Sequence, residues 1–338
     1  RHLRHALSIA VALLCLWLST RGVDLGQVAK VLMGASPWYV LLAGVLSCAI
    51  NCSKCLKLGI LLRAVKQIPY LTLFCAETIS VLVDVAFPFR LQELVKAYVV
   101  GRREGLRPSL VLGAEVVEKG VEAIFLLFAM LLLGLMWGLP PWLERTLWGG
   151  FGGLALVLAF FTLVIARPTR LQLPLARIRD RSGGITGRLC DSILQLLEGI
   201  RAAAVRPSML LWVLALTLVD WLLLAGSLVA AAAAIGLRLG PGQQLALLVA
   251  NFIAFALPTS SAGSVGIYEL AGKTVLVALF GMDPEVSLAL VLVFHAVMVG
   301  FGALCGLLGL ALSHLSISDL RQQLDGHQEP SPGEDPRP

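Results

Sequence analysis

Apolar residues occur along this chain in long runs that are separated by short polar stretches. Six of the runs hold about 20 residues, enough for a helix to cross a hydrocarbon core of about 30 Å. They hold few charged residues, so they predict an all-α, polytopic membrane protein. The predicted spans are residues 6–20, 38–58, 109–137, 147–165, 209–235 and 286–313.

Two further apolar segments, 70–89 and 243–281, are interrupted by helix breakers. Each break is followed by a Glu-Leu pair and then by a lysine. The first segment is too short to cross and return as full helices, and the second needs two half-helices that meet at its break. Both are therefore predicted to be re-entrant, because irregular backbone is tolerated at membrane depth only inside protein or beside a wet cavity. The residues that break the backbone are Pro88 in the first segment and Pro258, Ser260, Gly263 and Gly266 in the second.

Composition agrees with a membrane protein. Hydrophobic residues make up 58% of the chain and charged residues 14%, and the mean hydropathy is +0.86. Soluble proteins carry roughly 25% charged residues, so a soluble fold is excluded. Lys and Arg gather on one side if both termini are cytoplasmic and both broken segments return to the side that they left. The net charge of +6 therefore reflects membrane topology and gives no support to nucleic-acid binding.

The order of segments predicts two halves. Residues 1–140 and 141–313 each contain two spans, a re-entrant segment and a third span. An odd number of spans turns the second half upside down relative to the first, as in inverted-repeat carriers with alternating access. The alternative is that the breaks only relieve packing strain. Between the spans of the second half, the basic, amphipathic stretch 167–207 is expected to be an interfacial linker, and the tail 314–338 is expected to be disordered.

Charged residues inside the third predicted span are the strongest candidates for function, because each costs roughly 2.5 to 3.5 kcal/mol at a helix centre. Glu115, Glu118, Lys119 and Glu122 share one helical face by their spacing. One lysine cannot neutralise three carboxylates, so positive partners must come from elsewhere or a carboxylate is protonated. The nearest candidates in sequence are Arg90 and Lys96.

Other buried polar positions leave more than one interpretation open. Glu77 and Asp84 in the first broken segment, and Asp220 in the fifth span, add to a polar interior. For Glu115 and Asp220, an ion-pair network that holds helices in register is as good an account as a functional role. His295 lies in the middle of the last span and is expected to bond to a neighbouring helix rather than to relay protons.

No pattern for catalysis or metal binding is present. Cys52 and Cys55 have CxxC spacing, but no second pair and no nearby histidine accompany them. Phosphate loops and the nucleophile and zinc motifs of hydrolases are missing from the sequence. We therefore expect a protein that is not an enzyme and that needs no cofactor or metal.

Two motif sets resemble a known family. The first runs from Pro88 through Arg90, Glu93 and Lys96, continues with a Gly-Arg-Arg-Glu-Gly stretch at 101–105, and ends with Glu118 to Glu122 in the third span. The second comprises residues 258–263, Gly266 to Glu269, the stretch 280–285, His295 and Gly306. Together they cover nearly the whole chain and are similar to the transmembrane region of lysylphosphatidylglycerol synthases, also called flippase-like integral membrane proteins. The fused aminoacyltransferase domain of true synthases is absent from this sequence.

The resemblance implies a bacterial or archaeal inner-membrane protein that moves lipids with large polar heads between leaflets. Such lipids are anionic or aminoacylated phospholipids and polyprenyl-linked intermediates. Alternatives are a non-transporting partner of a lipid-modifying synthase or glycosyltransferase, or an integral-membrane transferase; homo-oligomers are also compatible. Lys119 stands where the family commonly has arginine, which removes a planar fork that grips phosphate.

The resulting candidate site has three parts. Arg90 and Lys96 are predicted to attract a lipid phosphate, and Glu93 with the Glu118, Lys119 and Glu122 face to contact the polar or cationic head. The second break, with its glycines, is predicted to form the opposing gate. The backbone of this gate is broken at Pro258, Ser260, Gly263 and Gly266, as Pro88 breaks the first segment. Tyr268, Glu269 and Lys273, which follow the second break, are predicted to bind the substrate as well.

Overall fold

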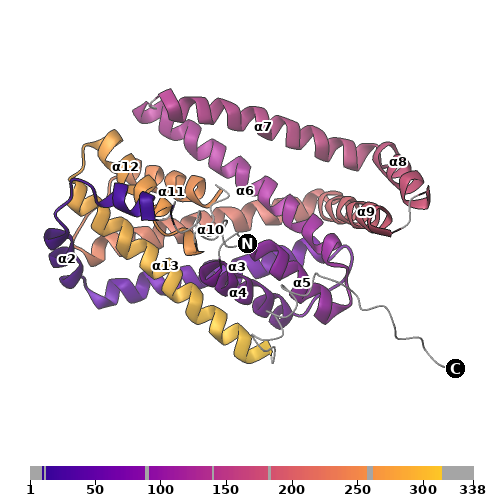
Figure 1. Cartoon of the computed structure of the whole chain (residues 1–338), viewed down its shortest axis with the longest axis horizontal. Coiled ribbons are helices and arrows are strands. Elements are labelled where there is room, and N and C mark those ends of the chain that lie inside the picture. The colour runs from indigo at the N-terminus through magenta and orange to yellow at the C-terminus, as the bar shows by residue number, and fades with distance from the viewer. Residues whose placement is uncertain are drawn as a thin grey trace.

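A computed structural model describes residues 10, 13–87, 91–138, 141–181, 184–256 and 262–313. Every regular element in this part of the chain is a helix (Figure 1). The predicted all-α, polytopic membrane fold is confirmed.

Five helices in the described ranges are long and apolar enough to cross a membrane. They coincide with five of the six predicted spans, whose existence is thereby confirmed. The sixth predicted span, 6–20, lies partly outside the described residues; residues 13–20 are helical. The five helices are α3 (Pro37–Leu62), α6 (Pro108–Trp137), α7 (Pro141–Ala166), α10 (Pro207–Ala234) and α13 (Pro284–Ser313).

Proline and glycine set the ends of these helices. α3, α6 and α10 have proline in the first turn, where its missing N–H would have no helical partner anyway. The helix that precedes α6 ends at Gly105 (φ +68°), and the helix that precedes α13 ends at Gly281 (φ +59°). Left-handed residues of this kind favour glycine, which explains both stops.

Two short helices that pack against each other flank each break. The first break lies between α4 (Tyr70–Ala86) and α5 (Gln92–Glu104), and the second between α11 (Pro241–Ala256) and α12 (Ile267–Phe280). α5 lies beyond residue 89, where the first broken segment was predicted to end, so the first break has a helix on both sides, as the second does. These helices have 13 to 17 residues and are not candidate spans. The two half-helices expected in the second segment are thus present. Re-entry of either segment to the side that it left stays a prediction.

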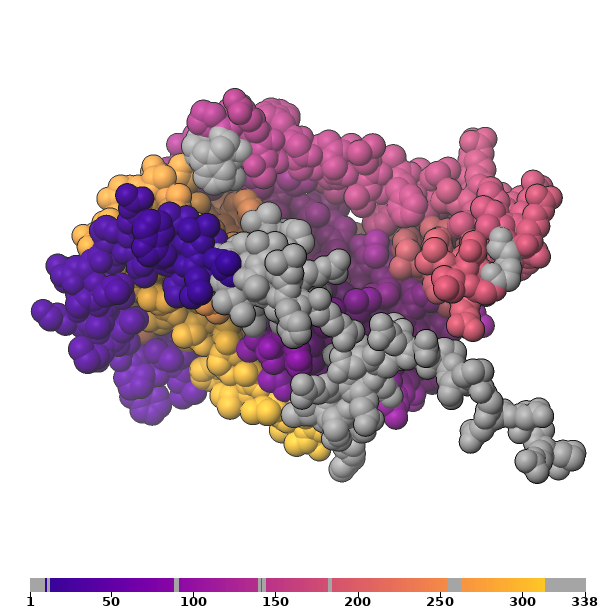
Figure 2. Space-filling model, in the orientation of Figure 1, coloured from indigo at the N-terminus to yellow at the C-terminus, as the bar shows by residue number. Residues whose placement is uncertain are grey.

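The basic stretch 167–207 of the second half contains two helices, α8 (Pro168–Arg181) and α9 (Gly184–Ala204). α9 packs closely along α6, where Gly113 and Gly199 face each other's backbone. α7 runs along one edge of the molecule and forms a ridge there with α8 (Figure 2). Few of its side chains are buried, as expected for a helix that faces lipid. The tail 314–338 lies outside the described residues.

Helix contacts in the two halves correspond when α3, α4, α5 and α6 are exchanged with α10, α11, α12 and α13. α3 packs along α10, α4 along α13, and α11 along α6; α5 packs on α6 as α12 packs on α13. Such correspondence is what a two-fold relation between halves requires. The inversion of the halves across the membrane stays a prediction. An additional short helix, α2 (Leu25–Met33), packs on α13.

Two lysines, Lys57 and Lys96, are not where the charge distribution placed them, because the predicted topology counts both as cytoplasmic and both are buried. Lys57 is counted with the cytoplasmic lysines between 54 and 66 in the predicted topology. In the structure it belongs to α3 and is fully buried. α3 continues to Leu62, four residues beyond the predicted end of the span, and this extension brings Lys57 inside the helix bundle.

Candidate functional site

A cavity of about 470 Å³ lies between the two halves. Ten apolar side chains line it together with charged and amide side chains, so its wall is both apolar and polar. The two breaks contribute to the same wall through Glu93 and Gly263. Charged or amide residues that line it are Asn51, Lys54, Asp84, Gln92, Glu93, Lys119, Glu122, Asp220 and Asn251.

Lys57 holds three helices together behind this wall. Its ammonium nitrogen lies 2.8 Å from Glu118 Oε1, 2.8 Å from Asp220 Oδ2 and 3.4 Å from Glu122 Oε1. The lysine comes from α3, the two glutamates from α6 and the aspartate from α10. Buried charges must be paired to persist, so this lysine allows three carboxylates to remain at membrane depth.

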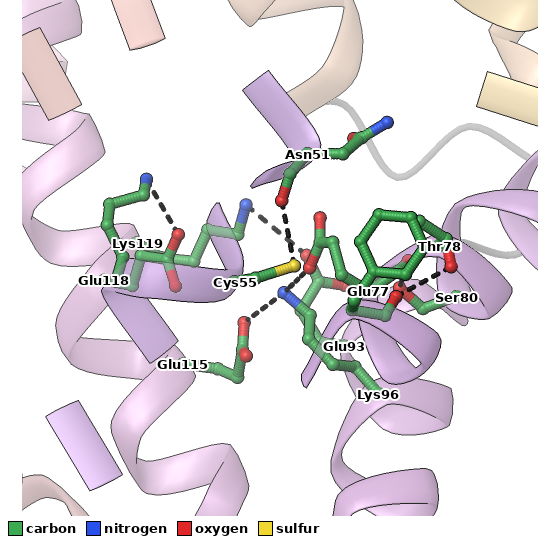
Figure 3. Close-up of polar contacts among 12 residues, drawn as sticks. Asn51, Cys55, Glu77, Thr78, Ser80, Glu93, Lys96, Glu115, Glu118 and Lys119 are labelled. Atoms are coloured by element: carbon green, nitrogen blue, oxygen red, sulfur yellow. Dashed lines mark hydrogen bonds and ion pairs between the residues drawn. The ribbon is translucent and has the colours of Figure 1, made fainter. Parts of the chain in front are cut away.

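A second buried lysine, Lys96 of α5, joins α4 to α6 (Figure 3). Its ammonium nitrogen lies 2.7 Å from Glu77 Oε2 and 3.0 Å from Glu115 Oε2. The side chain is 4% exposed, and both carboxylates are more deeply buried. Lys96 is therefore a partner for the third-span glutamates, as their unbalanced charge predicted. It does not line the cavity.

Lys119 faces the cavity and is half exposed. Its ammonium nitrogen lies 3.0 Å from Glu122 Oε2 and 3.5 Å from Glu93 Oε1. The contact with Glu93 connects α6 to the first turn of α5, directly after the first break. Glu118, although only one position away, points to Lys57 instead. The single charged face predicted for α6 is thus divided between the cavity and two buried ion-pair clusters.

Lys54 also lines the cavity and makes no ion pair within the part of the chain that the structure describes. It lies on α3, three positions before Lys57. A half-buried ammonium group without a carboxylate partner is suited to an anionic ligand, because it carries charge that the protein does not neutralise by direct contact.

The second half contributes an aromatic and amide wall. Trp221 of α10 stacks on Phe252 of α11 with 4.6 Å between ring centroids and 8° between planes. Next to them, Asp220 and Asn251 also line the cavity. Oδ1 of each of these two side chains is buried, with no hydrogen-bond partner among the described residues.

The second break is closed by three short hydrogen bonds around Glu269. Its Oε2 accepts the backbone N–H of Gly266 at 2.6 Å, and its Oε1 lies 2.6 Å from His295 Nδ1. His295 Nε2 lies 2.8 Å from the carbonyl oxygen of Gly263. Tyr268 stacks on the imidazole with 4.3 Å between centroids. The expected bond between His295 and a neighbouring helix is confirmed.

The remaining predicted residues are only partly described. Gly263 and Gly266 have positive φ angles of +60° and +91°, as a break that needs glycine predicts. The ammonium group of Lys273 donates to the carbonyl oxygens of Ser19 and Arg21, away from the cavity. Arg90, Pro88, Pro258 and Ser260 lie outside the described residues.

Sequence reasoning missed the second-half wall and the role of Lys57. Trp221 and Asn251 sit in predicted apolar segments without any motif. For Lys57 a signal existed, because it lies one residue before the predicted end of a span. His, Cys, Asp and Glu side chains form no group of three that fits a metal ion in the described ranges.

Taken together, the apolar helices, two broken segments and charged interior cavity define a polytopic helical membrane protein with a polar site inside the bundle. The sequence profile of the lysylphosphatidylglycerol synthase transmembrane region matches residues 5–306. The chain belongs to this family, as its motifs predicted, and is a membrane protein related to lipid handling. No curated protein matches its sequence.

Proposed function

We propose that this protein is a carrier that moves a lipid with a large polar head between the two leaflets of a bacterial or archaeal inner membrane. The observation that carries the proposal is a charged cavity between the two halves, to which both helix breaks contribute. A site at the junction of two broken helices is typical of carriers in which two repeats move against each other. In the orientation that the distribution of Lys and Arg predicts, both termini of the carrier are cytoplasmic.

The wall offers groups for a phosphate and for a polar head. Lys54 and Lys119 supply positive charge, while Glu93, Glu122 and Asp220 supply acceptors. A phosphodiester next to Lys54 would leave its head facing the carboxylates. This assigns the phosphate to Lys54 in the described conformation, because Lys96 is enclosed by Glu77 and Glu115. Arg90, which lies outside the described residues, keeps its predicted role.

Apolar side chains around the same cavity fit the remainder of such a substrate. Ile50, Val81, Val85, Leu126 and Leu224 line it beside the charged groups. Lipid heads cannot cross the hydrocarbon core unaided at a useful rate, since each buried charge costs several kcal/mol. A cavity with both kinds of wall lowers this cost while the acyl chains remain in lipid.

Leaflet-resolved labelling of lipids in proteoliposomes tests the proposal. The candidates are a phosphatidylglycerol, an aminoacylated phosphatidylglycerol and a polyprenyl-linked sugar, each offered separately. Lys54→Ala, Glu122→Gln and Arg90→Ala are compared with Arg177→Ala, an exposed position on α8. Loss of one charge-assisted hydrogen bond, worth about 1.5 to 3 kcal/mol, should slow movement at least about tenfold in the first three variants only.

The alternatives make different predictions in the same experiment. A protein that only holds a synthase or glycosyltransferase at the membrane moves none of the lipids. An integral-membrane transferase changes the lipid chemically, which mass spectrometry of the extracted lipid detects. If the purified protein moves no candidate lipid and the cavity variants match it in cells, the carrier proposal is wrong.

A further inference from the structure

The second half of the molecule repeats the first in a way that aligns two ion pairs. Glu269 and His295 lie 176 positions after Glu93 and Lys119, respectively. The same spacing relates Gly105 to Gly281, the left-handed glycines at which α5 and α12 end. It also relates Pro108 to Pro284, the first residues of α6 and α13. α6 and α13, which carry the cationic partner, both have 30 residues.

These two pairs are therefore structural equivalents. In each, a glutamate in the first turn after a helix break contacts a basic side chain on the following long helix. The first pair is open: its atoms are 3.5 Å apart, and the side chains of Lys119 and Glu93 are 48% and 34% exposed. The second pair is closed at 2.6 Å, with 5% and 4% exposure for His295 and Glu269.

The contacts of the imidazole determine how many protons the second pair holds. A carbonyl oxygen can only accept, so the 2.8 Å contact with Gly263 requires a hydrogen on His295 Nε2. The 2.6 Å contact between Nδ1 and Glu269 Oε1 requires one more hydrogen between them. The other carboxylate oxygen already accepts the N–H of Gly266. The pair thus holds one proton that it can release.

Release of that proton is incompatible with the closed geometry. It leaves the imidazole with one N–H for two acceptors, in a site that water does not reach. In one tautomer the Nδ1 lone pair faces Glu269 Oε1, and in the other the Nε2 lone pair faces the carbonyl oxygen of Gly263, so one of the two contacts must open. Both contacts hold the break itself, because Gly263 belongs to it and to the cavity wall, and Glu269 accepts the N–H of Gly266.

No other charged side chain neutralises the pair in the described ranges: Glu269 is the one Asp or Glu within ion-pair distance of His295. Tyr268 stacks on the imidazole and covers it. Helices that pack on α12 or α13 carry further titratable groups. Lys30 of α2 is exposed. Others bond elsewhere or line the cavity, among them Cys48, Lys54 and Lys57 of α3; Glu77 and Asp84 of α4; Asp220 of α10; and Lys273, Glu285 and Cys305 of α12 and α13.

We propose that Glu269 and His295 form a proton-binding site that closes the second break, so that a proton is the coupling ion of the carrier. Proton coupling rests on the proposed lipid transport, whereas the proton-dependent closure of the break does not. The equivalent first pair has no such dependence, because an ammonium group titrates about four pH units above an imidazole. The second break is thus controlled by protonation, whereas the first is held by an ion pair whose charges do not change at physiological pH.

The test measures access to the second break as a function of pH. Ser264, next to Gly263 and buried while the break is closed, is replaced by cysteine in a protein whose seven native cysteines are serine. Its rate of reaction with a polar maleimide in nanodiscs is divided by the rate for Ile185→Cys, an exposed position on α9. This ratio removes the pH dependence of the reagent. It should rise with pH by up to about tenfold per unit, the slope for one proton.

Two variants separate the proton site from other causes. Glu269→Gln supplies a permanent N–H donor to the imidazole, and His295→Lys copies the first pair; both should keep the ratio low at every pH. A flat ratio in the parent protein, or a step that both variants retain, overturns the proposal.

Nitrogen-15 NMR of histidine provides a second measurement that does not depend on these variants folding. The signals of His295 are those lost in His295→Gln. They should show one nitrogen losing its proton over the same pH range as the step in access, and unchanged signals overturn the proposal. If access to the second break depends on pH but no lipid moves, the carrier proposal is wrong and the proton site stands. If lipid moves but access does not depend on pH, the proton site is wrong and the carrier proposal stands.

Discussion

The two breaks differ in what holds them, although their glutamates are equivalent. At the first break, Glu93 contacts a lysine that shares its charge with Glu122 and remains half exposed to the cavity. At the second, the polar contacts of the Glu269 carboxylate within the described residues are a buried histidine and backbone. A lysine keeps its charge at every physiological pH, whereas this histidine can donate to both the carboxylate and the carbonyl oxygen of Gly263 only while the additional proton is present. The same position in two repeats can therefore respond to different signals.

Buried charge is also distributed unequally. The first half contains Lys57 and Lys96 with five carboxylates bonded around them, one of which, Asp220, comes from the second half. The second half has Glu269 and His295 at its break. Fixed ion pairs make the first half and its junction with α10 a rigid frame, because breaking a buried pair leaves an uncompensated charge. Movement is then expected mainly at the second break.

The largest effect is expected from Lys57→Met, which tests the rigid frame. It leaves Glu118, Glu122 and Asp220 without their shared cation. Removing one partner of a buried ion pair typically costs about 3 to 5 kcal/mol, so the Tm in nanodiscs should fall strongly. Lys66→Met, at the exposed ion pair with Glu104, is the matched control and should cost less than about 1 kcal/mol. Equal shifts in Tm for both variants would contradict a rigid first half.

The next effect concerns movement between the halves. Cys48 of α3 and Cys305 of α13 are reduced, with 3.2 Å between their sulfur atoms. Oxidation should join them and tie one half to the other, so lipid movement should fall to the level of empty liposomes and return with reductant. Cys48→Ser should be unaffected by oxidant. Undiminished movement in the oxidised, cross-linked protein would show that α3 and α13 do not separate during transport.

A smaller effect should follow when the first pair is made to resemble the second. Lys119→His replaces a permanent cation by an imidazole, whose ordinary pKa is about 6.5. Above that pH the attraction to Glu93 and Glu122 is lost, and below it the attraction is regained. Lipid movement by this variant should therefore acquire an additional pH dependence of a few-fold, measured against Lys119→Arg. Identical pH profiles for the two variants would remove the distinction between the breaks.

The smallest effect lies at the end of α5, outside the candidate spans. A hydrogen bond from Lys66 lowers the pKa of Glu104. A lowered carboxyl pKa contributes stability above the unfolded value of about 4.3, and this contribution disappears as pH falls through the lowered value. At pH values below the lowered pKa, Glu104→Gln and the parent protein should have the same Tm. At neutral pH the parent should be more stable by less than about 1 kcal/mol, and a constant difference at all pH values would be inconsistent with this assignment.

The sequence predicted the membrane helices and both breaks because hydropathy and helix-breaking residues are local signals. It also indicated that the α6 glutamates need outside cations, since their charge is unbalanced within one helix. Their actual partners could not be predicted, because the rotation and depth of α3, α5 and α10 decide which charges meet. Lys57 and Asp220, 163 positions apart in sequence numbering, are joined only by the packing of α3 on α10.

At the second break, too, the sequence predicted the residues but not which of them contact each other. Its glycines and Glu269 were recognisable from the sequence, and so was a bond for His295 to a neighbouring helix. The identity of the partner was not, because no pattern connects a residue in α12 to one in α13. That the pair of Glu269 and His295 is equivalent to the pair of Glu93 and Lys119 can be recognised only when both contacts are known from the structure. The aromatic and amide wall of Trp221, Phe252 and Asn251 had no local signal at all.

Leaflet-resolved lipid labelling of Glu269→Gln proteoliposomes tests the central claim most directly. The account predicts that the parent protein moves a candidate lipid and that Glu269→Gln, with its second break held closed at every pH, moves it no faster than empty liposomes. Arg177→Ala should match the parent. Movement by Glu269→Gln at the parental rate would contradict the claim that opening of the second break is required for transport.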